Sequence, residues 1–209
     1  MVRLLFISMF ALCLVIGTAF AQTIEWDQVS SSAAEQESGV VADAYGSPPN
    51  ATVNDLWVRA NAMVRSGDNP SVSSSARYVI TASQTGRITS LGNYNSVRIY
   101  GRLCHYASAQ ITFLYGSLTQ SYESYGKVAV TSHNGAYLEY TKVRDTAWGT
   151  QYTPVNSDYL LADVPNWDGR PIQLSRISKA TAECSRTGLN LLVETVETTA
   201  SIRAEGYNR

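Results

Sequence analysis

The sequence predicts an all-β protein, an antiparallel β-sandwich of the jelly-roll or immunoglobulin-like kind with a loose N-terminal arm. Three observations favour this fold. From Asn95 to Val143, β-branched and aromatic residues recur at every second position, the period of a sheet with one buried face. Similar alternating runs follow one another along most of the chain, and clusters of Gly, Asn, Ser and Pro separate them. At most one short helix fits the pattern.

The first 21 residues have the pattern of a secretory signal peptide. Arg3 is followed by an apolar run from Leu4 to Ile16, and Ala19-Phe20-Ala21 ends the segment with small residues at the positions that signal peptidase reads. The apolar run is shorter than the roughly 20 residues that span a bilayer. We therefore expect cleavage after Ala21, no integral membrane segment afterwards, and a secreted or extracytoplasmic location, whether extracellular, cell-surface or periplasmic.

Residues 22–53 form the predicted arm and linker, because they are mostly small and polar. Near the start of the arm, Ile24 and Trp26 alternate with polar residues like a short strand. Such a strand has two uses, which the sequence leaves open. It either adds to the sheet of a neighbouring subunit, as an assembly arm in a homo-oligomer, or covers the protein's own sheet.

Residues 54–209 form the predicted β domain, with eight to ten strands. In the first strand Leu56, Val58, Ala60, Ala62 and Val64 share one face, which we expect to be buried. An outer-membrane barrel is the rival architecture. It is disfavoured because long lipid-facing alternation is missing.

The dipeptide Asn134-Gly135 predicts a β-hairpin, since it accepts the positive φ angles of a type I′ turn. A two-residue turn sets Ala129 opposite Tyr140 on the core face and turns Val128 and Val130 outward or towards a second layer. It also places Lys127 opposite Lys142, which is an unfavourable pair.

Cys104 and Cys184 remain after signal cleavage, and an even count in an exported protein predicts one disulfide, with two free buried thiols as the alternative. Val97, Ile99 and Leu103 share a parity that excludes Cys104 from the core face. A bulge at Gly101 is expected to turn Cys104 inward.

The charge balance excludes two classes of partner. Lys and Arg number 16 against 17 Asp and Glu. Such a chain has neither the basic surface that attracts nucleic acid nor a polybasic membrane patch.

No catalytic, metal or cofactor motif is present. His105 and His133 are the only histidines, and we interpret them as a strand residue and a turn residue rather than as catalytic bases. Asp158, Asp163 and Asp168 supply the oxygen ligands that calcium prefers, but their spacing matches no metal loop, so we predict no metal site.

Residues 144–171 are expected to be irregular and to carry the binding site for a ligand or partner. Their aromatic residues are Trp148, Tyr152, Tyr159 and Trp167. Flat rings beside amides and carboxylates stack on sugars or on a partner's side chains. The alternative is that these rings seal one end of the core. Asn50 is a candidate glycosylation acceptor, in Asn50-Ala51-Thr52.

Two functional hypotheses follow. The first is a secreted, non-enzymatic β protein that acts by binding or assembly at the cell surface or envelope, as a structural, adhesive or filament-type subunit. The second is a secreted carbohydrate-binding module or hydrolase that uses the aromatic 144–171 loop. The partners are accordingly other protein subunits or surface glycans.

Overall fold

The computed structural model describes residues 24–39, 41–65, 71–144 and 149–209. These residues form nine strands, all paired antiparallel, and no helix, so none of them forms a helix that could cross a membrane. The strands are β1 (Ile24–Trp26), β2 (Ser30–Ser38), β3 (Ala42–Ala51), β4 (Asp55–Arg65), β5 (Ser74–Ile88), β6 (Ser96–Val130), β7 (Tyr137–Arg144), β8 (Gly149–Val164) and β9 (Ile172–Tyr207). The predicted all-β antiparallel class is confirmed. The predicted signal peptide lies outside the described residues.

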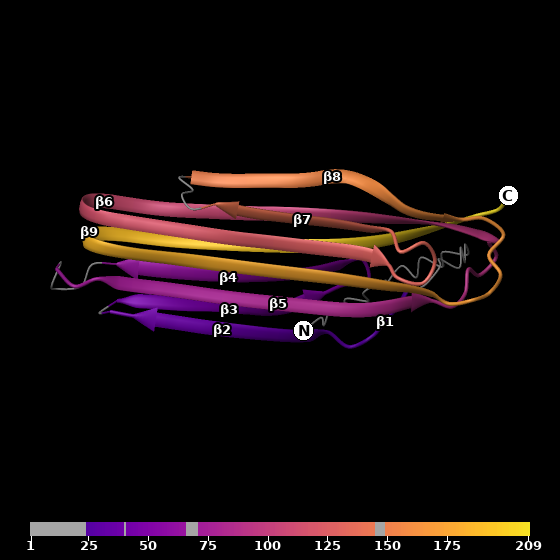
Figure 1. Ribbon diagram of the computed structural model, residues 1–209, viewed down its shortest axis with the longest axis horizontal. Coiled ribbons are helices and arrows are strands. Elements are labelled where there is room, and N and C mark those ends of the chain that lie inside the picture. The colour runs from indigo at the N-terminus through magenta and orange to yellow at the C-terminus, as the bar shows by residue number, and fades with distance from the viewer. Residues whose placement is uncertain (1–23, 40, 66–70, 145–148) are drawn as a thin grey trace, which may run out of the picture.

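The two longest strands, β6 and β9, form a ribbon that organises the fold. They pair from Ser96 opposite Tyr207 to Val130 opposite Leu174. Midway, Gly116 lies opposite Gly188, and both have positive φ angles, of 113° and 84°. At this end of the molecule both strands turn back on themselves (Figure 1). Each strand therefore contributes one segment to each half of the fold.

The other strands extend these two halves. β4 pairs with the second half of β9 and carries β3, whereas β5 pairs with the first half of β9 and carries β1 and β2. β8 pairs with the first half of β6 and β7 with the second half. The described strands thus form one continuous sheet, curled so that its halves face each other (Figure 1). The structure shows this curled sheet and does not confirm the jelly-roll or immunoglobulin-like sandwich.

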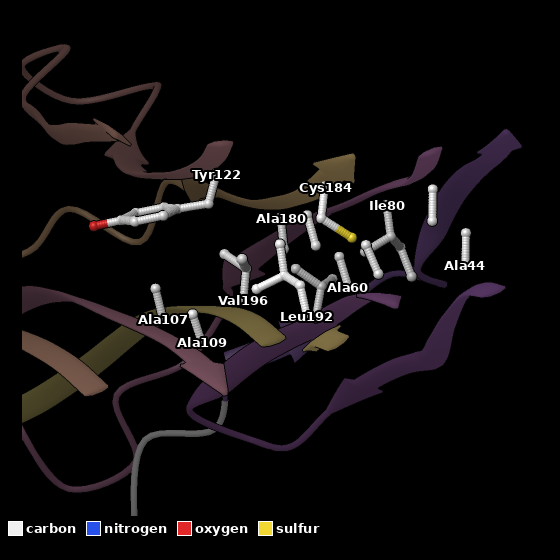
Figure 2. Close-up of a cluster of buried hydrophobic side chains, with 14 of the residues drawn as sticks. Ala44, Ala60, Ile80, Ala107, Ala109, Tyr122, Ala180, Cys184, Leu192 and Val196 are labelled. Atoms are coloured by element: carbon white, nitrogen blue, oxygen red, sulfur yellow. The ribbon is translucent and has the colours of Figure 1, made fainter. Parts of the chain in front are cut away.

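Apolar side chains from both halves fill the space between them. The predicted inward face of β4 is confirmed, because all five of its apolar residues from Leu56 to Val64 are fully buried. They pack with residues of β5, β6 and β9 in a cluster rich in alanine, whose small side chains let the facing halves approach closely (Figure 2). A second cluster fills the other end of the fold, around Ile99, Leu103 and Ile202.

The segment that we predicted to be a loose arm belongs to the sheet. β2 pairs with β5 from Ser30 opposite Ser83 to Ser38 opposite Ser75. The Glu37 carboxylate also accepts a hydrogen bond from the backbone N–H of Ala44, at 2.6 Å, which ties β2 to β3. The prediction was wrong because an edge strand with exposed side chains shows no apolar alternation, although all nine of its residues pair with β5.

The hairpin at Asn134-Gly135 is confirmed, but its predicted register is wrong. Ala129 lies opposite Tyr137, and Val128 opposite Leu138. In the observed register Val128 and Val130 are both completely buried, and this removes the apolar surface of both side chains from water. This register also replaces the unfavourable lysine pair by an ion pair, with Lys127 Nζ at 3.5 Å from the Glu139 carboxylate.

The predicted disulfide is wrong. Cys104 lies opposite Thr199 and Cys184 opposite Gln120, and neither cysteine is in a disulfide. The pairing of β6 with β8 is irregular near Gly101, but the alternation of β6 continues through it, so the half-buried Cys104 stays on the outer face. Cys184 points into the core (Figure 2), where burial raises the pKa of its thiol to about 12.

Replacing Gly188 with alanine is expected to destabilise the protein by about 1–3 kcal/mol, because a side chain at this positive φ is strained. A Cβ there would also lie only 2.2 Å from the carbonyl oxygen of Tyr115. Chemical denaturation measures the loss. Gly135→Ala is the matched control, since Gly135 has a φ of 66° but no atom within 4 Å of the added Cβ. Equal losses in the two variants would show that close packing of the bend contributes nothing.

Candidate functional site

A cavity lies at the end of the sheet where two turns meet. One turn joins β6 to β7 and the other joins β8 to β9. The cavity encloses about 400 Å³ and is lined by Ser132, His133, Val164, Pro165, Asn166, Trp167, Asp168, Arg170, Pro171 and Ile172. We call it the Trp167 cavity. Of the four aromatic residues that the sequence singled out, it contains Trp167.

Trp167 is held in place from several sides. Its backbone N–H donates to the carbonyl oxygen of Asn95 at 2.8 Å, and its indole N–H donates to that of Arg170 at 2.7 Å. The preceding Asn166 has a positive φ of 49°, which asparagine tolerates better than most residues. The half-buried ring also packs against the second core cluster. Trp167 therefore presents a fixed aromatic surface to the cavity.

Polar groups surround this ring. The Asp168 carboxylate accepts a hydrogen bond from the backbone N–H of Arg170 at 3.0 Å, and its second oxygen lies 3.3 Å from the guanidinium of the same residue. On the opposite turn, the hydroxyl of Ser132 accepts a hydrogen bond from the backbone N–H of Gln173 at 2.7 Å. The Asp168 contacts stay within its own turn, whereas the Ser132 bond ties the other turn to the start of β9. A rigid ring among mixed donors and acceptors suits a small ligand that carries hydroxyl groups.

Of the other three predicted binding residues, the structure places only the side chain of Tyr159, which is not among the described residues of the lining. The segment expected to be an irregular loop is largely strand β8. Trp148 lies outside the described residues, and so does the side chain of Tyr152. Tyr159 lies on β8 opposite Gly101, with 53% of its surface exposed. The cavity instead uses Ser132 and His133, from a turn more than 30 residues earlier in the sequence, which the sequence interpretation treated only as a turn.

Ile24 and Trp26 lie against their own chain. β1 pairs with β5, with Ile24 opposite Ile88 and Trp26 opposite Gly86. The indole of Trp26 donates to the carbonyl oxygen of Val53 at 2.7 Å and lies 3.9 Å from the guanidinium carbon of Arg176. This is the second of the two uses that the sequence left open. Pairing with another subunit stays a prediction.

Asn50 lies on β3, exposed, where the register between β3 and β4 shifts. This position is accessible to a modifying enzyme. Its glycosylation stays a prediction.

His105 and Ser124 form a buried pair inside the curled sheet. His105 Nδ1 lies 2.5 Å from Ser124 Oγ, which also contacts the hydroxyl of Thr198. Burial, and to a lesser degree the charge of Lys142, lower the pKa of His105 to about 4. Both residues are at most 3% exposed, so no substrate reaches them. We interpret the network as packing. In the part of the chain that the structure describes, no three His, Cys, Asp or Glu side chains group to hold a metal ion.

No protein-family model matches the chain, and no curated protein matches its sequence. Two solved structures show a weak likeness: the enzymatically active domain of tailspike protein 4 of bacteriophage CBA120, and TmCBM61 in complex with β-1,4-galactotriose. Both are 8% identical to this chain, with TM-scores of 0.20 and 0.22. The likeness covers 79% of this chain and 19% of the tailspike chain, and 65% of this chain and 86% of TmCBM61. The chain thus spans about a fifth of the tailspike structure. At these TM-scores neither likeness carries an argument about function.

Proposed function

We propose that the protein is an exported, non-enzymatic binding protein that recognises carbohydrate at the Trp167 cavity. The observation that carries the proposal is the fixed Trp167 ring beside donors and acceptors from two turns. Sugars offer an apolar ring face for stacking and hydroxyl groups for such polar side chains. Export is supported by the signal-peptide pattern of residues 1–21.

The lining of the cavity supports binding rather than hydrolysis. Glycoside hydrolysis ordinarily requires two carboxyl groups on either side of the scissile bond. Among the described residues that line the cavity, Asp168 supplies the one carboxylate, and Arg170 is its ion-pair partner. A carboxylate held in this way is suited to accept hydrogen bonds from sugar hydroxyls.

Trp167→Ala is expected to weaken glycan binding at least tenfold, about the effect of removing a central aromatic residue from a binding site. A glycan array with the mature protein would identify the ligand, and titration calorimetry would measure the affinity. Tyr45→Ala is the control, because Tyr45 is an exposed aromatic residue on β3, outside the cavity lining. Trp167→Phe is a second variant for the same titration, because it retains part of the packing against the core. An array without signal, or equal affinities of the Trp167→Ala and Tyr45→Ala variants, would exclude the proposed site.

A further inference from the structure

A second hollow lies on the outer surface of the sheet, where four segments of chain meet. It encloses about 150 Å³, and its lining includes Asp55, Tyr100, Arg102, Asp158 and Arg203. Ser201 of β9 lies opposite both Asp55 of β4 and Arg102 of β6. One row of side chains across three strands therefore forms the floor of this hollow, which we call the Arg102 pocket.

Most charged groups of the Arg102 pocket are already engaged. Arg203 pairs with the Asp158 carboxylate at 2.7 Å, also pairs with Glu205, and lies 5.0 Å from the ring centre of Tyr100. One oxygen of Asp55 accepts a hydrogen bond from the Ser201 hydroxyl at 2.5 Å. These contacts fix the walls of the pocket and leave acceptor capacity on both carboxylates.

Arg102 differs from these groups. It is exposed, and no hydrogen bond or ion pair joins its guanidinium to any side chain that the structure describes. By contrast, Arg98 on the same face of β6 lies 3.4 Å from the Asp163 carboxylate and 4.5 Å from the ring centre of Tyr207. A guanidinium presents a planar fork of N–H donors that matches a carboxylate in two parallel hydrogen bonds. Arg102 is thus the group in this pocket that is open to an anionic ligand.

The Arg102 pocket and the Trp167 cavity are connected through strand β6. Asn166, beside Trp167, donates from its backbone N–H to the Ser96 hydroxyl at 3.1 Å, and Arg102 follows six residues later on the same strand. That separation corresponds to about 20 Å along a strand, which an oligosaccharide of several units can span. The pair of Arg98 and Tyr207 lies between the two sites on the same face.

We infer that the ligand is an acidic polysaccharide, with the carboxylate of a uronic acid unit bound by Arg102 and its hydroxyls by Asp55 and Asp158. The inference rests on the proposed function, since the same chain would extend to Trp167. It adds the chemical class of the ligand. Planar carboxylate recognition by Arg102 and hydroxyl recognition by the two carboxylates together select a sugar acid over a neutral sugar.

The test compares each acidic glycan with its own neutral form. Oligomers of galacturonate, of mannuronate and of glucuronate-containing glycans are titrated before and after chemical reduction of their carboxyl groups to alcohols. For the wild-type protein, reduction is expected to lower the affinity for the preferred ligand at least tenfold. This is the order of effect of charge-assisted hydrogen bonds. In Arg102→Gln the acidic and reduced forms should bind alike. Arg77→Gln makes the same charge change on β5, outside the pocket lining, and should retain the preference.

The outcomes separate this inference from the proposed function. Equal wild-type binding of acidic and reduced forms, with loss in Trp167→Ala, would overturn the uronate assignment and leave carbohydrate binding intact. Binding restricted to sulfated glycans would overturn it in the same way. A preference for the acidic form that persists in Arg102→Gln would also overturn it. If no glycan of any kind bound, both proposals would fall.

Discussion

Replacing Arg176 with alanine is expected to lower the free energy of unfolding by about 3–5 kcal/mol, because it removes charge-assisted hydrogen bonds and a cation–π contact from a buried side chain. Arg176 lies on β9 with none of its surface exposed. Its guanidinium donates to the side-chain oxygen of Gln84 at 2.6 Å and to the carbonyl oxygen of Thr52 at 2.9 Å. The substitution would leave the buried side-chain oxygen of Gln84 without this donor, and would remove the stack on Trp26.

The Arg176 contacts join three separate segments of chain. They bind β9 to the end of β5 through Gln84, to the turn before β4 through Thr52, and to β1 through Trp26. Burial lowers the pKa of Arg176 to about 10, so the guanidinium remains charged at neutral pH. Its removal is therefore expected to loosen β1 first, which hydrogen exchange at Trp26 would detect.

Urea denaturation measures the stability loss, with Arg170→Ala as the control because 89% of that arginine side chain is exposed. Arg176→Met separates volume from polarity, since it fills most of the space but donates no hydrogen bond. If Arg176→Met were as stable as the wild type, the polar contacts would contribute nothing net, and packing alone would account for the alanine effect.

The local periodicity of the sequence predicted much of the fold. The inward positions of β4 follow from simple alternation, and so do Val97, Ile99 and Leu103 on β6, all of which are buried. These predictions succeed because the side-chain period of a strand depends only on neighbouring residues.

Features that depend on distant partners were not predictable in this way. Gly116 and Gly188 are separated by 71 residues in the sequence, and only their pairing shows that one continuous ribbon bends there. The hairpin register buries Val128 and Val130, and their burial outweighed the local preference of Asn134-Gly135 for a two-residue turn. The free energy of burial, rather than turn propensity, therefore determines the register of this hairpin.

The candidate site illustrates the same limit. Trp167 could be selected from composition, because an aromatic ring among polar residues is recognisable in a sequence. Its cavity partners Ser132 and His133 could not, since the approach of their turn depends on the curl of the sheet. Arg102 could not either, because what distinguishes it from Arg98 is the lack of a carboxylate partner among the described side chains.

The second large expected effect is a loss of stability at alkaline pH caused by Glu194. This residue points into the core between Leu192 and Val196 and is 1% exposed. One carboxylate oxygen accepts a hydrogen bond from the backbone N–H of Glu183 at 3.1 Å. Burial is the main cause that raises the pKa of Glu194 to about 8 from an ordinary value of 4.5. The folded protein therefore keeps this proton at pH values where the unfolded chain has lost it.

The sign of the effect follows from proton linkage. Between the two pKa values the folded state binds more protons, so the free energy of unfolding falls as pH rises, by about 1.4 kcal/mol per pH unit. Over the whole interval the cost of Glu194 is about 4–5 kcal/mol. Glu194→Gln keeps an acceptor for the Glu183 N–H and cannot ionise. It is therefore expected to be more stable than the wild type by several kcal/mol at alkaline pH.

His105 determines how the free energy of unfolding changes with pH on the acid side. Its pKa falls to about 4 from an ordinary value of 6.5, so the unfolded chain takes up the proton first and stability decreases as pH falls through this interval. Where the two intervals overlap, the contributions of His105 and Glu194 oppose each other. For these two groups, the wild-type curve should therefore be flat from about pH 4.5 to 6.5 and lose about 2 kcal/mol between pH 6.5 and 8.

Denaturation curves across this pH range distinguish the variants by shape. In Glu194→Gln, stability should rise up to about pH 6.5, because His105 then acts alone, and stay level above it. Glu183→Gln is the matched control, since this carboxylate is half-exposed and pairs with Arg77, and its curve should keep the alkaline decline. An alkaline decline that persists in Glu194→Gln would mean that another group causes it and that the ionisation of Glu194 does not limit stability.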